Sequence, residues 1–144
     1  MSLMTLENAV MAAVVTQLKG VSGISGISVV QGNADTLIAV PRIAVEATRE
    51  ASAIPGYAVF PVRVEVVVTA NAYQQTGTTM TGNAEIEKLF AYVYNSLTGD
   101  LTELTNSNVL IHGVRWDGSV SDLRQDRIIS RTWSFTLLAS PLND

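Results

Sequence analysis

The chain has 144 residues, no cysteine and one histidine, and its formal net charge at pH 7 is −4. This length fits one domain with a sizeable core, and 47% hydrophobic residues exclude a disordered chain. The acidic balance argues against a nucleic-acid binder, and the lack of cysteine excludes disulfides, thiolate nucleophiles and cysteine-ligated zinc.

No stretch of the sequence has the composition of a membrane span or a secretory leader. The apolar runs fall short of the roughly 18–20 residues that a span requires. The first twenty residues are amphipathic, with Glu7 early and no basic segment before it, so a signal peptide is not expected. We therefore expect a protein that does not enter a membrane.

The first predicted element is an amphipathic helix from Thr5 to Lys19. Its apolar residues recur at steps of three and four, Thr5 can cap its start, and Gly20 suits its end. Gly23 and Gly26 continue a glycine pattern that resembles a phosphate loop superficially. No strand precedes it and no Gly-Lys-Ser/Thr follows, so the segment is interpreted as a plain loop.

Three strands are predicted between this helix and the next, at residues 27–31, 38–48 and 57–69. The third has an apolar face built largely of valines and a partly polar face. Pro61 lies within it, and because proline has no N–H, it predicts an edge position or a bulge. The segment after this strand, residues 70–82, is polar and rich in Gln and Thr.

A second amphipathic helix is predicted from Asn83 to Gly99. Asn83 can cap its start and Gly99 suits its end. Glu85 and Glu87 fit the positive N-terminal end of the helix dipole.

Two further strands are predicted after this helix. The first covers residues 109–116, with Leu110, Val114 and Trp116 on one face and His112 interrupting it. A polar connection at residues 117–126 leads to the closing strand, residues 127–139. In that strand Arg131 falls on the apolar side, so it requires a partner or an exposed end.

The order of these elements predicts an α+β fold. Strands stand before and after a helix, and hairpin-length connections join the members of each pair. We expect a single domain over residues 1–144, with a mainly antiparallel sheet of four to five strands. Two amphipathic helices should form a single layer on one face of that sheet.

Residues suited to catalysis are scarce. His112 is the single imidazole, no Gly-X-Ser-X-Gly occurs, and a lone histidine on a strand face is more often packed or solvated. One histidine without cysteine does not make a zinc site, and Asp117, Asp122 and Asp126 lack the spacing of a calcium loop. The sequence predicts no catalytic residue, no metal and no cofactor, and therefore not an enzyme.

Three places are candidate subunit contacts. Residues 117–127 alternate acidic and basic groups, which fits a solvated loop with weak ion pairs or, as we favour, a self-complementary contact. The pair Arg63 and Glu65 fits a solvated sheet face or a face packed on another protomer. The segment at 74–79 is a loop that can order against a neighbour. The candidate interface residues are Arg63, Glu65, Tyr73, Gln74, Gln75, Thr78, Arg115, Asp117, Asp122, Arg124, Asp126 and Arg127.

The sequence of elements from about Thr5 to Pro141 resembles the tail terminator (tail completion) proteins of long-tailed bacteriophages. The likeness lies in the order and length of the elements, with no short motif. It is carried by the N-terminal helix, the strands around residues 41–46 and 55–57, the long strand 60–68, the helix at 84–90 and the closing strand 127–136.

The resemblance implies a ring of identical subunits, six-fold in that family, that caps the head-proximal end of the tail tube. Such a ring stops tube polymerisation and joins the tail to the neck. Its partners would be other copies of itself, the tail tube protein and a neck or connector protein, with DNA only passing through the lumen. Its location would be the virion, after assembly in the host cytoplasm. Two alternatives stay open: another head–tail connector or tube-type virion protein, and a non-viral small-ligand-binding α+β domain.

Overall fold

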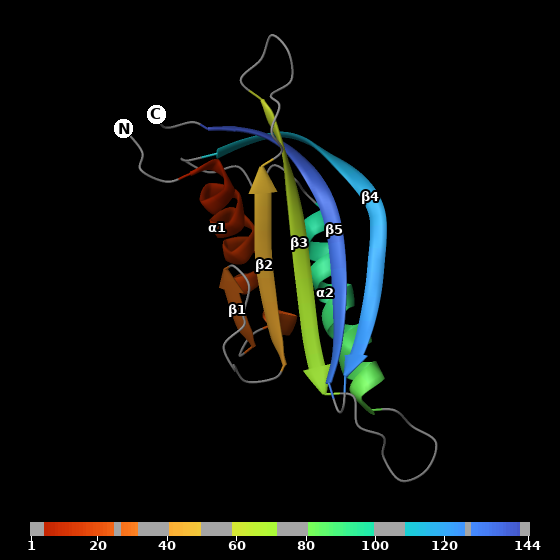
Figure 1. The fold of residues 1–144 in the computed structure, drawn as a ribbon. Helices are drawn as coiled ribbons and strands as arrows, with labels where there is room; N and C mark the ends of the chain where they lie inside the picture. Colours follow the sequence, from red (N-terminus) through yellow and green to blue (C-terminus); the bar gives the residue numbers. More distant parts are fainter. Residues whose placement is uncertain are drawn as a thin grey trace.

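A computed structural model describes residues 5–24, 27–31, 41–49, 59–71, 81–99, 109–125 and 128–141. Its elements are α1 (Leu6–Lys19), the short 3-10 helix η1 (Ser22–Ile24), β1 (Ser28–Gln31), β2 (Arg42–Arg49), β3 (Phe60–Asn71), α2 (Thr81–Gly99), β4 (Val109–Gln125) and β5 (Ile128–Pro141). The strands form one five-stranded sheet in the order β1-β2-β3-β5-β4 (Figure 1).

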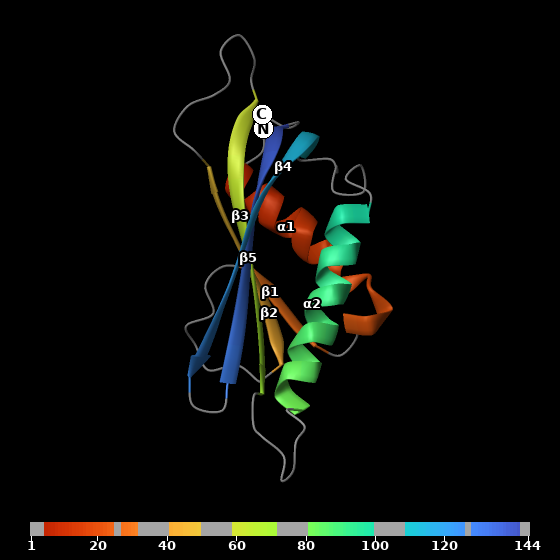
Figure 2. The ribbon, with the colours of Figure 1, turned by 90° about the vertical axis from the view of Figure 1, so that its right-hand side faces the viewer.

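Both helices lie on the same face of this sheet, and none of the described residues forms a helix on the opposite face (Figure 2). Pairing is antiparallel between β2 and β3, between β3 and β5, and between β4 and β5. The predicted α+β fold, with a mainly antiparallel sheet and one layer of helices, is confirmed. The edge strand β1 departs from it, because it pairs with β2 in parallel.

The helix α1 begins and ends where the sequence predicts. The hydroxyl of Thr5 accepts a hydrogen bond from the backbone N–H of Asn8 at 3.2 Å, which satisfies one of the free donors of the first turn. The apolar stripe of α1 is buried against the sheet. It contains Leu6, Ala9, Val10, Ala13, Val14, Val15 and Leu18.

The strand β3 lies at the centre of the sheet, between β2 and β5, so the edge position predicted from Pro61 is wrong for the strand as a whole. The described pairing with β2 ends at Arg49↔Val62, and Pro61 pairs in register with Leu138 of β5. The proline therefore lies just past the last described partner on the β2 side and within the described pairing on the β5 side. The valines at 62, 64, 66 and 68 are fully buried on the helix side.

The polar connection predicted at residues 117–126 is wrong. The strand β4 continues through Gln125 and pairs with β5 up to Gln125↔Ile128, so two residues, 126 and 127, separate the strands. Charged side chains on an exposed edge strand look like loop composition in the sequence, because polar residues suit both. The β4–β5 pair forms a long ribbon along one edge of the sheet (Figure 1).

The strand β4 also contains two register shifts, between Ile111 and Gly113 and between Arg115 and Ser119. Because of the first shift, Leu110 and Val114 do not share a face as predicted. Leu110 pairs with Ser140 on the helix-free side, whereas Val114 pairs with the buried Leu137. A β-bulge inserts a residue without a partner, and here that residue is His112.

The helix α2 begins at Thr81, two residues earlier than predicted, so Asn83 lies in its first turn and is not its cap. Thr and Asn are both favoured at helix starts, so the run at 81–83 offered more than one starting point. Ile86, Leu89, Val93 and Leu97 form its buried stripe. No helix in the described part of the chain combines the length and the apolar character needed to cross a membrane.

Candidate functional site

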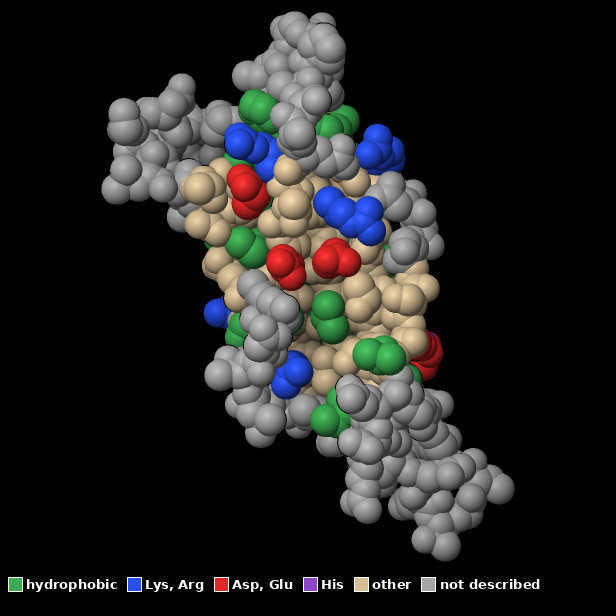
Figure 3. All heavy atoms as spheres, viewed as in Figure 1, with side chains coloured by type: hydrophobic (Ala, Val, Ile, Leu, Met, Phe, Trp, Pro, Cys, Tyr) green, Lys and Arg blue, Asp and Glu red, His purple; other side chains and the backbone are tan. Residues whose placement is uncertain are grey.

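The helix-free face of the sheet is a broad polar surface built from every second residue of four strands (Figure 3). The antiparallel registers place these residues in rows that run across the strands. We name each row after its β3 residue. They are the Pro61 row (Pro61, Leu138, Gly113), the Arg63 row (Thr48, Arg63, Thr136, Arg115), the Glu65 row (Glu46, Glu65, Ser134), the Val67 row (Ala44, Val67, Thr132, Ser121) and the Thr69 row (Arg42, Thr69, Ser130, Leu123).

Opposite charges lie in two neighbouring rows of this face, the Arg63 row and the Glu65 row, and a further arginine, Arg42, belongs to the Thr69 row. Glu46 of β2 and Glu65 of β3 are directly opposite each other, and Figure 3 shows two acidic side chains side by side near the middle of this face. Arg63 belongs to the neighbouring row and is exposed. Among the described residues, no salt bridge joins Glu46, Glu65 or Arg63 to another group. Like charges in directly opposed positions repel, so this arrangement costs the isolated sheet free energy.

The rest of the face carries mostly short hydroxyl residues. Ser134 and Thr136 of β5 are almost fully buried between their neighbours although they point away from the helices. The hydroxyls of Thr69 and Ser130 lie 3.2 Å apart across β3 and β5, within hydrogen-bond distance. Ser134, Thr136 and Thr69 are covered by neighbouring side chains, so they add little accessible surface to this face.

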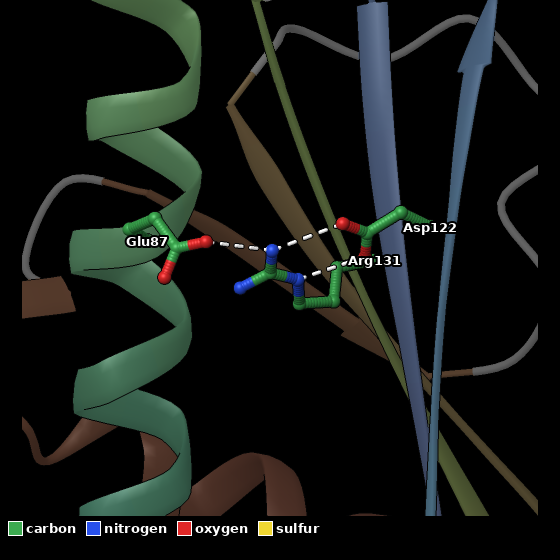
Figure 4. Close-up of polar contacts among 3 residues, drawn as sticks. All are labelled: Glu87, Asp122 and Arg131. Carbon is green, nitrogen blue, oxygen red and sulfur yellow. Dashed lines mark hydrogen bonds and ion pairs between the residues drawn. The ribbon is translucent and has the colours of Figure 1, made fainter.

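A second polar cluster lies on the helix side, where Arg131 bridges two carboxylates (Figure 4). Its Nε and Nη2 donate to the two carboxylate oxygens of Asp122 on β4 at 2.8 and 2.9 Å. Nη2 also donates to Oε1 of Glu87 on α2 at 2.7 Å. The guanidinium further lies over the ring of Phe90, with Cζ 5.2 Å from the ring centroid. One side chain thus connects three elements, and a fork geometry of this kind fixes orientation.

Arg131 sets the protonation behaviour of both carboxylates. Its hydrogen bond, and then its positive charge, lower the pKa of Glu87 below the ordinary value. Its hydrogen bond also lowers the pKa of Asp122, against a smaller opposing effect of burial. The side chain of Arg131 is 14% exposed, whereas those of Asp122 and Glu87 are 40% and 64% exposed. The sequence requirement that Arg131 find a partner is confirmed, and the partners are these two residues.

The β4–β5 ribbon carries most of the exposed apolar side chains. Of the four large hydrophobic residues that the described part of the chain exposes, three lie on this ribbon: Leu123 at 66%, Val120 at 49% and Ile128 at 39%. The fourth is Tyr94 of α2, whose ring packs 5.2 Å from that of Trp133 between centroids. Val120 pairs with the buried Trp133 on the helix side. Leu123 and Ile128 lie on the helix-free side, so the ribbon exposes apolar groups on both faces. Exposed apolar groups of this kind mark a surface that other chains can contact.

The predicted interface residues are only partly brought together. Arg63 and Glu65 share the helix-free face as expected, and Arg115 belongs to the row of Arg63. Asp122 lies on the other side of the sheet and pairs with Arg131 of β5, not with an arginine of its own segment. Asp117 and Arg124 are positions on β4. The other candidates, Tyr73, Gln74, Gln75, Thr78, Asp126 and Arg127, lie outside the described residues.

His112 has a serine within reach. Its Nε2 lies 2.8 Å from Oγ of Ser140, an exposed contact across the β4–β5 ribbon. A nucleophile–base pair needs a third group to orient the imidazole, and no carboxylate of the described residues bonds to this ring. The described residues also contain no group of three or more His, Asp or Glu side chains that could hold a metal.

The sequence did not indicate that Glu87 belongs to the Arg131 cluster, because a glutamate near the start of a helix is also explained by the helix dipole. The cross-strand acidic pair was missed as well, since Glu46 and Glu65 become neighbours only through the β2–β3 register.

In comparisons with known proteins, no protein-family model matches the chain and no curated protein matches its sequence.

Proposed function

We propose that this protein is a structural subunit that closes into a ring through contacts between neighbouring copies. We propose further that it acts as a tail terminator, the class that its order of elements resembles. In that role it caps the head-proximal end of a tail tube, stops tube polymerisation and joins the tail to the neck.

The exposed apolar side chains of the β4–β5 ribbon are the observation that supports this proposal most. Leu123, Val120 and Ile128 lie on an edge ribbon whose outer strand has 17 residues. Long edge strands with exposed apolar groups are prone to pair with other chains. A head-to-tail contact from such an edge to a different surface of the next copy closes into a ring when the rotation closes.

Electron microscopy of the purified full chain tests ring formation. Rings of uniform size with a central hole are expected, together with a mass by light scattering that is a fixed multiple of the subunit mass. A chain that stays monomeric at every concentration would contradict the proposal. A ring that leaves polymerising tail tube protein uncapped would point to another head–tail connector.

Variants of the ribbon locate the contact. Leu123→Lys is expected to break the ring and preserve the fold, because its side chain is 66% exposed in the isolated chain. Thr16→Lys, at an exposed position of α1, is the matched control and should leave the ring intact. Charge reversal at Arg124 and Asp126 is also expected to weaken ring formation more than folding. Loss of folding in Leu123→Lys, or an unchanged ring, would remove the ribbon from the proposal.

A further inference from the structure

The helix-free face of the sheet has a pattern of charge that is complementary to itself. From Pro61 onward, the outward residues of β3 run in the order Pro61, Arg63, Glu65, Val67 and Thr69. The Arg63 and Glu65 rows carry opposite charges, and on β3 they are flanked by the apolar Pro61 and Val67. The Thr69 row beyond Val67 carries Arg42 on β2. When the order of the four residues from Pro61 to Val67 is reversed, Pro61 meets Val67 and Arg63 meets Glu65.

We infer that two copies of this chain pack face to face through the rows of these four residues. The two-fold axis lies between the two sheets, perpendicular to the strands, and passes between the Arg63 row and the Glu65 row. This axis places each strand over the same strand of the second copy, with the two strands running in opposite directions. A contact of this kind uses the same patch on both copies.

This symmetry determines which residues meet. Arg63 of each copy lies over Glu65 of the other, so two identical ion pairs form on either side of the axis. Glu46, which neighbours Glu65 across β2 and β3, lies diagonal to the same arginine. On β3, Pro61 lies over Val67, and on β5, Leu138 lies over Thr132. The second copy thus supplies the cation that the opposed glutamates lack within the described chain.

The shape of the face permits this contact. Packed sheets lie about 10 Å apart, a distance that an arginine and a glutamate reaching from opposite sides can span. Ser134 and Thr136 are short and nearly buried, so in the middle of this face the side chains of β3 and β5 that reach outward are those of Arg63 and Glu65. Four strands about 4.8 Å apart and rows spread over about 20 Å make a patch of roughly 400 Å² per copy. Such a size predicts weak, reversible association.

The contact does not depend on ring closure. A chain that forms no ring would pair as a dimer, and a ring-forming chain would stack two rings. In both cases the loss of the face-to-face contact halves the mass of the assembly. The loss of ring closure instead leaves a dimer, whose mass is twice that of the subunit. Mass measurement therefore distinguishes failure of this inference from failure of the proposed function.

Single charge reversals and their mixture form the test, with mass followed by sedimentation over a range of protein concentration. Arg63→Glu alone and Glu65→Arg alone should each weaken face-to-face association at least about 30-fold. An equal mixture of the two variants should restore it, because the mixed contact again has one acid opposite one base at both places. Lys88→Glu, an equal charge change at an exposed position on the helix side, should have no effect.

Several outcomes would overturn the inference. The first is that the unaltered chain associates but Arg63→Glu does not weaken this association. The second is that the unaltered chain shows no concentration-dependent association. The third is that the mixture of the two variants stays dissociated. Circular dichroism establishes that each variant is folded. If a reversal unfolds the chain, Glu65→Gln and Arg63→Gln replace it, and each should still weaken association about tenfold.

Discussion

Glu46 of β2 and Glu65 of β3 are direct cross-strand partners on the side of the sheet that carries no helix. Two carboxylates in this position repel each other, and neither forms a salt bridge within the described chain. The pair therefore lowers the stability of the single subunit, while the second copy that we infer would place an arginine against it.

Neutralising one of the two glutamates should stabilise the isolated chain. Glu65→Gln is expected to raise its free energy of unfolding by about 0.2–1 kcal/mol, as the relief of a cross-strand like-charge pair. Urea denaturation at low protein concentration measures this gain. Glu46→Gln should give a similar gain, and the double variant little more, because the repulsion is already gone after the first change. Two gains that add fully would mean that the two side chains do not interact.

The two carboxylates on Arg131 should contribute unequally. Asp122→Ala is expected to cost about 1–2 kcal/mol, because it removes a two-point hydrogen bond from a guanidinium that is mostly buried. Glu87→Ala should cost less than about 1 kcal/mol, since Glu87 makes one hydrogen bond and is largely exposed. Urea unfolding of both variants provides the comparison, and the reverse order would contradict the geometry.

The same cluster should make stability fall in acid. Arg131 lowers the folded-state pKa of Glu87 and of Asp122 below the ordinary values of 4.5 and 3.8. A carboxyl whose pKa is lower in the folded chain contributes stability above its unfolded pKa and loses it as the pH falls through the folded pKa. Unfolding free energy measured downward from about pH 5 should therefore decline. Arg131→Met should flatten that decline, and an equally steep profile in this variant would assign the acid sensitivity elsewhere.

Gly23 is a position where even a methyl group should be costly. A Cβ at Gly23 would overlap the ring of Tyr92 on α2, where η1 approaches that helix. Gly23→Ala should therefore destabilise the chain by about 1–3 kcal/mol, as an overpacking substitution. Gly113→Ala is the matched control, because nothing lies within 4 Å of a Cβ there. Thermal or urea unfolding compares the stability of the two variants. Equal losses of stability would show that the Tyr92 ring moves to make room for the methyl group.

His112 should be dispensable. Its hydrogen bond to Ser140 is exposed, so His112→Ala is expected to cost no more than about 1 kcal/mol and to leave the assembled mass unchanged. Light scattering and urea unfolding check both statements. A folded variant that has lost its function would reopen a catalytic role for the His112–Ser140 pair.

The sequence was sufficient for elements whose period is regular. The apolar stripe and the Thr5 cap of α1 predicted that helix correctly, and the alternating valines of β3 predicted its buried face. The strand β4 was predicted too short because its second half contains charged residues, which are equally typical of loops. Strand partners could not be derived, since register depends on the packing of distant segments. The row pattern and the Glu46–Glu65 pair followed only from that register.

The register shifts of β4 also bear on changes of chain length. The strand β4 has 17 residues and β5 has 14, so β4 contributes three more residues to the ribbon than β5 does. One of these is His112, and the shift between Arg115 and Ser119 takes up the other two. Deleting His112 would leave every remaining residue of β4 opposite its present partner, whereas deleting Ser121 would turn one part of the strand over. We therefore expect natural length variation in this ribbon at its two irregular points, where one residue can be gained or lost with both faces of the sheet preserved.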